Sequence, residues 1–281
     1  MRDLNPMEIG VMFWGGDDPA STLAAYTRLG IRSGQLGIPP EMQLNGAASA
    51  WKNALAQADF TIYSVFAAFE GESYTDIPTV RRTVGFVPRA TRMNREKRMF
   101  EVSDLAAELG VQSVATHIGC VPEDRNDPDY EAVRDVVRRL CDHIADRTFA
   151  LETGQESAAA LVDFMRDTAR ENLAVNFDPA NMILYGTGDP IEALEILGKR
   201  VISVHLKDGD YPDPGRPGSL GTELPTGAGK VGFSRFIEQL QKIGYKGPMA
   251  IEREASDPDQ RMADIKEGIE YIRRIVEKLR K

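Results

Sequence analysis

The sequence predicts a single (β/α)8 TIM barrel that spans residues 1–281. Three observations predict it: an apolar run recurs eight times, a polar or Gly/Pro-bearing loop follows each run, and an amphipathic segment follows each loop. This alternation favours parallel strands that are joined by right-handed crossovers. The length agrees, because one α/β barrel commonly takes about 250 residues.

The expected elements follow one another along the whole chain. The strands are expected at residues 9–14, 33–38, 60–66, 113–117, 148–152, 174–178, 201–206 and 249–252. The helices are expected at residues 21–29, 42–58, 89–109, 131–145, 158–171, 190–197, 233–243 and 260–279. Val133, Val136, Val137, Leu140 and Ile144 show the three- and four-residue spacing of a helix that is buried on one face.

An open, doubly wound sheet is the competing fold. Gly15 and Gly16 follow the first strand, but they are adjacent and lack the spacing of a dinucleotide-binding turn. Gly227-Ala228-Gly229-Lys230 lacks the upstream glycine and the Ser/Thr of a phosphate loop, so it is interpreted as an ordinary loop. Eight units in one run therefore favour the closed barrel.

Two connections are long, residues 70–88 and residues 207–231. The second holds four prolines and six glycines, so we expect no helix there. Long loops on the carboxyl side of barrel strands usually form the rim of the active site or a lid.

Composition excludes several classes of partner. The 34 Lys+Arg and 43 Asp+Glu residues give a net charge of -9, which disfavours nucleic acid. Cys120 and Cys141 are too few for a disulfide framework and are expected to be free thiols in a reducing cytosol. Residues 1–6 contain no apolar segment, and no run of 18 apolar residues occurs anywhere. We therefore expect a cytoplasmic protein without membrane contact.

Each of the last four strands ends in a residue that can bind a metal. These residues are Glu152, Asp178, His205 and Glu252. Consecutive barrel strands are neighbours, so the four side chains should converge at the carboxyl face. Any one of them could cap a helix or pair with a lysine, but three carboxylates together would repel one another without a cation. The set suits Mn²⁺ best, with Mg²⁺, Co²⁺ or Zn²⁺ as alternatives, and differs from a sulfur-rich structural zinc site.

The motifs around these residues resemble those of the sugar phosphate isomerase/epimerase superfamily. The motifs are Leu151-Glu152-Thr153-Gly154-Gln155-Glu156, Phe177-Asp178-Pro179-Ala180-Asn181, Val204-His205-Leu206-Lys207-Asp208 and Ile251-Glu252-Arg253-Glu254. This group of xylose isomerase-like TIM barrels includes ketose 3-epimerases, hydroxypyruvate isomerase and inosose dehydratase. The resemblance covers essentially the whole chain, and the motifs occur in the order of the family.

The resemblance implies a role for each matching residue. Glu152, Asp178, His205 and Glu252 match the four metal ligands, and Glu152 and Glu252 also match the acid/base pair of the epimerases. His117 matches a position that faces the substrate, and Glu156 resembles a carboxylate that orients it. Two positions depart from the ketose 3-epimerases. Asn181 stands where a histidine is usual, and Lys207, followed by Asp208 and Asp210, stands in a region where an arginine is usual.

Several further residues are candidates for substrate contact or for simpler roles. Trp14 and Phe66 end the first and third strands, where they could form an apolar wall for a sugar or simply pack. Lys207 could steady a negative oxygen or pair with Asp208 or Asp210. Arg253 and Glu254 are expected to support the neighbouring ligand. His143 is expected on a helix surface, and Cys120 is expected to be a small loop residue.

The residue types favour enolisation chemistry. One carboxylate removes a proton next to a carbonyl, a metal stabilises the enediolate, and a second carboxylate returns the proton. The predicted activity is that of a metal-dependent isomerase or epimerase of a small carbohydrate. The alternative is a lyase or dehydratase of a 3-keto-sugar, 3-keto-glycoside or keto-inositol.

Two other classes fit less well. A nuclease on this barrel would need many histidines, and the chain has three. A sensing barrel without activity would leave the two glutamates unexplained. Assembly stays open between a monomer and a homo-oligomer.

Overall fold

Eight parallel strands close into a barrel within residues 4–279, the part of the chain that the computed structural model describes. Around the barrel the strands follow the order β1-β10-β7-β6-β5-β4-β3-β2. They are β1 (Ile9–Trp14), β2 (Ser33–Ile38), β3 (Thr61–Ala67), β4 (Ser113–Thr116), β5 (Thr148–Glu152), β6 (Leu173–Phe177), β7 (Val201–Leu206) and β10 (Met249–Ile251). The predicted barrel is confirmed, and the open sheet is excluded.

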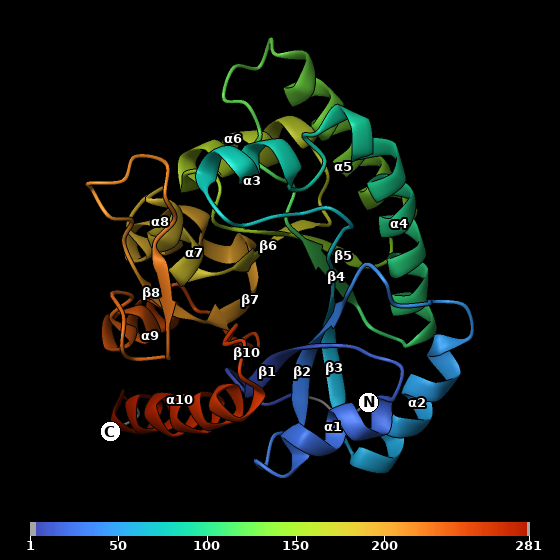
Figure 1. The fold of residues 1–281 in the computed structure, drawn as a ribbon, viewed down its shortest axis with the longest axis vertical. Coiled ribbons are helices and arrows are strands. Elements are labelled where there is room, and N and C mark those ends of the chain that lie inside the picture. The colour runs from blue at the N-terminus through green and yellow to red at the C-terminus, as the bar shows by residue number, and fades with distance from the viewer. Residues whose placement is uncertain (1–3, 280–281) are drawn as a thin grey trace.

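Helices surround the strands, as Figure 1 shows. They are α1 (Pro19–Thr27), α2 (Ala47–Ala58), α3 (Ile77–Thr83), α4 (Arg89–Glu108), α5 (Pro128–His143), α6 (Ala158–Thr168), α7 (Pro179–Tyr185), α8 (Pro190–Leu197), the 3₁₀ helix η1 (Gly198–Arg200), α9 (Phe233–Lys242) and α10 (Pro258–Leu279). Several begin at a capping side chain; for example, the Ser157 hydroxyl accepts a hydrogen bond from the Ala160 N–H at the start of α6.

The alternation of side chains along each strand separates two apolar regions. Phe13 points outward and packs on the rings of Tyr26, Trp51 and Phe60 beneath α1 and α2. Its neighbour Met12 belongs to a separate small cluster. Because successive side chains of a strand face opposite sides, the outer contacts bind the helices while the inner ones fill the barrel.

Four elements besides the short η1 were not expected from the sequence. Helix α3 lies within the predicted loop 70–88, and α7 follows β6 directly. The loop 207–231 contains no helix, as predicted, but it forms an antiparallel pair of β8 (Asp208–Asp210) and β9 (Thr222–Leu224). Each of these elements has seven residues or fewer, too few for a clear periodicity.

No helix among residues 4–279 is long and apolar enough to cross a membrane. Both ends of the predicted domain, residues 1–3 and 280–281, lie outside the described part of the chain. The prediction that residues 1–6 contain no apolar segment also falls partly on residues 1–3.

Candidate active site

The four predicted metal ligands come together at the carboxyl ends of the strands. Glu152 ends β5, Asp178 follows β6, His205 lies in β7 and Glu252 follows β10. One ligand atom from each lies within 4.8 Å of all the others. The four residues are between 0 and 8% exposed, so their charges are removed from bulk water. Such a group is costly to bury unless it binds a cation.

Three atoms of this group have no hydrogen-bond partner among the described residues: Asp178 Oδ2, His205 Nδ1 and Glu252 Oε2. They face a common point, because His205 Nδ1 lies 2.8 Å from Glu252 Oε2 and 3.8 Å from Asp178 Oδ2. Buried polar atoms without partners are rare. Carboxylate oxygens and a ring nitrogen that converge in this way fit a divalent cation, and an oxygen-rich set suits Mg²⁺ or Mn²⁺.

Asp178 serves two purposes at the end of β6. Its Oδ1 caps helix α7 and accepts hydrogen bonds from the N–H groups of Ala180 at 2.8 Å and Asn181 at 3.0 Å. The helix start therefore fixes the rotamer of the carboxylate and turns Oδ2 toward the other ligands. A single side chain thus couples the local structure of α7 to the metal site.

Amide side chains contact two of the other three ligands, Glu152 and His205. Asn176 Nδ2 donates to Glu152 Oε2 at 3.1 Å, and Asn181 Nδ2 donates to Glu152 Oε1 at 3.0 Å. Gln35, from β2, places its Oε1 2.6 Å from His205 Nε2. Sequence reasoning missed Asn176 and Gln35. The available signal was a polar residue inside a strand that is otherwise buried and apolar or small.

The charges of the site stabilise one another. Burial opposes ionisation of Glu252, but Lys207 and then His205 outweigh burial and lower the pKa of this carboxyl. Burial likewise opposes the charge on His205, yet Glu252 and Glu152 raise the pKa of the imidazole well above its usual value. The pKa of Asp178 is raised, chiefly by burial. Negative carboxylates and positive side chains therefore lie close together at the site, and a bound cation would change the pKa of each of them.

A cavity of about 670 Å³ opens above the ligands. Of the predicted substrate contacts, it is lined by Trp14, Phe66, His117, Asn181 and Lys207, together with Glu152 and Glu252. Four rings form a continuous row: Trp14 and Phe66 are edge to face, Phe66 contacts His117, and His117 contacts Tyr74. Tyr74, Tyr185, Glu223 and Arg261 also line the cavity and were not foreseen, because a loop, α7, β9 and α10, all distant in sequence, supply them.

A family model described as Xylose isomerase-like TIM barrel matches residues 23–275. The chain belongs to this family.

Individual proteins are also similar to this chain. The chain is similar to a xylose isomerase domain protein from Planctomyces limnophilus, with 39% identity, a TM-score of 0.92 and coverage of 97% of this chain and 98% of that chain. It shares its fold with the D-psicose 3-epimerase of Clostridium cellulolyticum H10, solved with D-tagatose, at 15% identity, a TM-score of 0.68 and coverage of 96% and 99%. A segment of 120 residues is 32% identical to the rhizopine catabolism protein MocC of Rhizobium meliloti, and it spans 39% of this chain and 35% of that protein.

Lys207 of this xylose isomerase-like barrel does not pair with Asp208 or Asp210, the partners considered from the sequence. It is 3% exposed, and its Nζ lies 2.7 Å from Glu254 Oε1 and 3.6 Å from Glu252 Oε2. Asp208 instead accepts backbone N–H groups, and Asp210 lies near Lys230. Strand geometry explains the difference, because Lys207 follows a barrel strand and points into the cavity.

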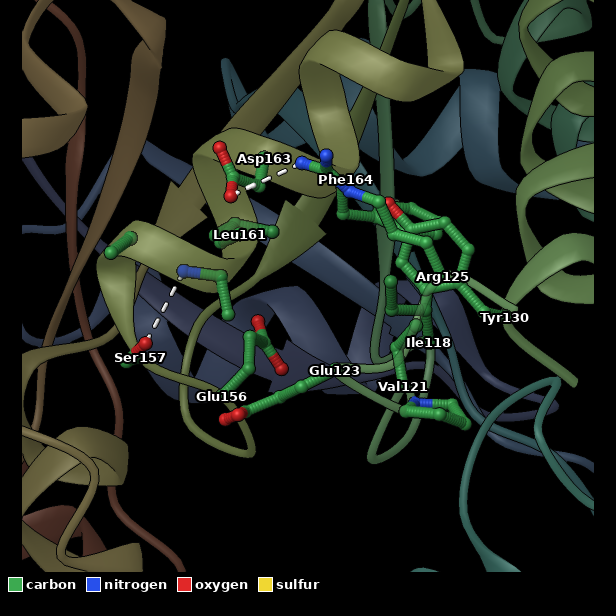
Figure 2. Close-up of a pocket in the computed structure, with 13 residues that line it drawn as sticks. Ile118, Val121, Glu123, Arg125, Tyr130, Glu156, Ser157, Leu161, Asp163 and Phe164 are labelled. Carbon is green, nitrogen blue, oxygen red and sulfur yellow. Dashed lines mark hydrogen bonds and ion pairs between the residues drawn. The ribbon is translucent and has the colours of Figure 1, made fainter. Parts of the chain in front are cut away.

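Glu156, which the family resemblance places beside the substrate, does not line the cavity above the ligands. It lines a second cavity of about 310 Å³ between the segment 118–130 and the start of α6, and Figure 2 shows it there with Val121 and Glu123. Neither of its carboxylate oxygens has a hydrogen-bond partner among residues 4–279. Burial raises the pKa of Glu156 to about 8.

Of the remaining candidates, Arg253 lines the cavity above the ligands, whereas His143 and Cys120 lie outside it. Arg253 links the rim of the barrel, because its guanidinium pairs with Glu223 in β9 and, at 2.7 Å, with Asp264 in α10. His143 ends α5 and lies 2.7 Å from Asp104 of α4. Cys120 and Cys141 are free, and burial raises the pKa of the Cys120 thiol to about 11. An unionised thiol is a poor nucleophile, in agreement with the interpretation of Cys120 as an ordinary loop residue.

Proposed function

We propose that this chain is a divalent-metal-dependent isomerase or epimerase that acts on a ketose or a related keto-polyol. Glu152 and Glu252 are the proposed acid/base pair. The observation that carries the proposal is their placement: both line one cavity, and β6 and β7 separate their strands around the barrel. Carboxylates on two sides of a bound substrate can remove a proton from one face and return it to the other.

The residues of the site support each requirement of this chemistry. Glu152, Asp178, His205 and Glu252 would hold the ion, with Mn²⁺ favoured and Mg²⁺, Co²⁺ or Zn²⁺ as alternatives. A bound divalent ion would supply Lewis acidity that stabilises negative charge on the substrate oxygens. Lys207 brings a buried positive charge to the same cavity, where it can stabilise a developing oxyanion.

The two glutamates are held differently, which suits a division of roles. Amide donors engage both oxygens of Glu152, whereas Glu252 Oε2 faces the cationic groups of His205 and Lys207, at 2.8 and 3.6 Å. His117, which belongs to the row of four rings, also places its Nε2 3.5 Å from Glu152 Oε1. We propose that Asn181 and His117 orient Glu152 and contact substrate hydroxyls. Trp14 and Phe66 would pack against the apolar face of the substrate.

A lyase or dehydratase on the same site is the second candidate, and the size of the cavity favours it. A hexose occupies on the order of 170 Å³, the share of about six water molecules in the liquid. The cavity of about 670 Å³ has room for a second ring. Trp14 and Tyr74 are 42% and 43% exposed in its lining, where rings of this kind could contact an aglycone. A 3-keto-glycoside would fill more of this space than a free ketose.

Deuterium incorporation tests the proposal. Mn²⁺-loaded protein would be incubated in D2O with fructose, psicose, tagatose, hydroxypyruvate, inosose and 3-keto-glucoside, and the products analysed by mass spectrometry. We expect incorporation next to the carbonyl of one substrate, with a loss of about 10²- to 10⁴-fold in Glu252→Gln and Glu152→Gln. Glu156→Gln is the matched control, because Glu156 lies outside this cavity, and it should retain exchange.

The products separate the two candidates. An isomerase or epimerase would return a sugar of unchanged formula apart from deuterium, whereas a lyase would release water or an aglycone and form an ultraviolet-absorbing enone. Absence of exchange throughout the panel, in protein that binds the metal stoichiometrically, would refute the proposed reaction. The single domain over residues 1–281, the cytoplasmic location and the state of assembly stay predictions from the sequence.

A further inference from the structure

Gln35 contacts the candidate metal ligand His205 across the inside of the barrel. Gln35 lies in β2 and His205 in β7, and β1 and β10 separate these strands around the barrel. The contact therefore crosses the barrel interior. Gln35 Oε1 lies 2.6 Å from His205 Nε2, and neither residue is more than 1% exposed. A short, fully buried contact of this kind fixes the positions of both side chains.

This contact determines which nitrogen of His205 carries the proton when the ring is neutral. The Gln35 amide places its carbonyl oxygen against His205, while its Nε2 has no hydrogen-bond partner among residues 4–279. In this orientation the oxygen can only accept, so His205 Nε2 donates to it. The lone pair of the ring then lies on Nδ1. Nδ1 is the atom that faces the carboxylates, 2.8 Å from Glu252 Oε2 and 3.5 Å from Glu152 Oε1. The ring is thereby prepared to bind a cation through Nδ1.

Asn176 does not compete for the Nε2 proton. Its Nδ2 lies 3.2 Å from His205 Nε2, and as a donor it could bond only to a ring nitrogen that carries no proton. The Gln35 oxygen is closer, at 2.6 Å, and favours the proton on Nε2. The orientation of the Asn176 amide is fixed, since Nδ2 donates to Glu152 Oε2 and Oδ1 accepts from the Ser203 hydroxyl. Turning the amide over would place Oδ1 against the Glu152 carboxylate, two acceptors face to face. Gln35 thus supplies the acceptor.

We propose that Gln35 is a positioning residue of the metal centre, which sets the protonated nitrogen and the ring orientation of His205. The inference rests on the metal site and not on the reaction that the site performs. Outer partners of metal-binding histidines typically change metal affinity by about 10- to 100-fold when they are removed. Loss of the Gln35 acceptor should act within this range, because the ring could then rotate or move its proton to Nδ1.

Metal affinity is the first test. Gln35→Met keeps the length of the side chain and removes the acceptor, and Mn²⁺ affinity would be measured by competition with a fluorescent chelator. We expect binding about 10- to 100-fold weaker than in the wild type. Ser64→Ala is the matched control. Ser64 pairs with Gln35 in the register of β2 and β3 and is equally buried, but its hydroxyl bonds to Ser113. Its affinity should be unchanged.

A spectroscopic test reads the proton directly. The chain has three histidines, so the ¹⁵N-histidine spectrum of the Mg²⁺-loaded protein is simple to assign. We expect a slowly exchanging Nε2–H signal from His205 that disappears in Gln35→Met and persists in Gln35→Glu, which keeps an acceptor oxygen. A proton on Nδ1 in the wild type, or unchanged Mn²⁺ affinity in Gln35→Met, would overturn the inference. If Gln35→Met does not fold, the wild-type spectrum still shows which nitrogen of His205 carries the proton.

The two proposals fail in different ways. A wild-type protein that binds no divalent ion would overturn both the metal site and the role of Gln35. Tight Mn²⁺ binding without deuterium exchange would overturn the reaction alone.

Discussion

Asp208 organises the long loop that borders the cavity. It is 1% exposed, and its carboxylate accepts four backbone N–H groups. Oδ1 accepts from Gly209 at 3.0 Å and Val231 at 3.1 Å, and Oδ2 accepts from Gly227 at 2.9 Å and Gly229 at 3.0 Å. A Cβ at position 229 would lie 2.4 Å from Asp208 Oδ1, so the chain can approach this closely only as glycine. The glycine-rich segment that was interpreted as an ordinary loop therefore wraps an internal carboxylate.

Asp208→Asn should destabilise the fold by about 3 kcal/mol or more. The substitution keeps the shape of the side chain but replaces one acceptor oxygen by an amide donor. Whichever oxygen is replaced, two of the four N–H groups lose their acceptor. Hydrogen bonds to a charged group contribute about 1.5–3 kcal/mol each, so the loss of two gives the stated value. For a chain of this length, 3 kcal/mol corresponds to a fall in Tm on the order of 6–12 °C.

Urea denaturation and thermal melting would measure the loss. Asp210→Asn is the matched control, because its side chain is 46% exposed and the nearest cation, Lys230 Nζ, lies at 3.8 Å. The control should cost less than about 0.5 kcal/mol. Limited proteolysis should also cut residues 211–219 faster in Asp208→Asn, since the loop ends are no longer held. Equal stability of the two variants would refute the stabilising role of the buried carboxylate.

Three further predictions concern the site and its surroundings. Mn²⁺ at about 100 times its Kd should stabilise the wild type by about 2.7 kcal/mol, and this gain should vanish with a chelator and in Asp178→Ala. Burial raises the pKa of Glu156 from 4.5 to about 8, so ionisation penalises the fold increasingly from about pH 4.5 to 8. Glu156→Gln should therefore be more stable than the wild type at pH 8, by up to about 4 kcal/mol, and equal to it at pH 4. If the free energy of unfolding of the wild type does not fall between pH 4.5 and 8, the carboxyl of Glu156 is not buried as described. Lys207→Met removes a positive charge 3.6 Å from Glu252 Oε2 and should tighten Mn²⁺ binding while it lowers the stability of the metal-free protein, as titration and melting would show. Weaker Mn²⁺ binding in Lys207→Met would refute this electrostatic account.

The order of elements along the chain was sufficient to predict the barrel and its ligand group. Apolar runs that alternate with amphipathic segments favour parallel neighbours, and neighbouring strands end at the same face. Glu152, Asp178, His205 and Glu252 each end or nearly end such a run, so their convergence followed from connectivity alone. The same reasoning placed Trp14 and Phe66 in the lining of the cavity.

Contacts between parts of the chain that connectivity does not bring together were decided by the tertiary structure. Gln35 reaches His205 across the barrel, and that pairing depends on how the closed sheet staggers its strands. Lys207 pairs with Glu254, and Glu156 turns into a different cavity, because loop packing sets their directions. Local sequence specifies which residues end a strand and which face each side chain takes, since successive side chains of a strand alternate between its two faces. It does not specify which distant side chain meets them, because that depends on closing the barrel and on the packing of every loop around it.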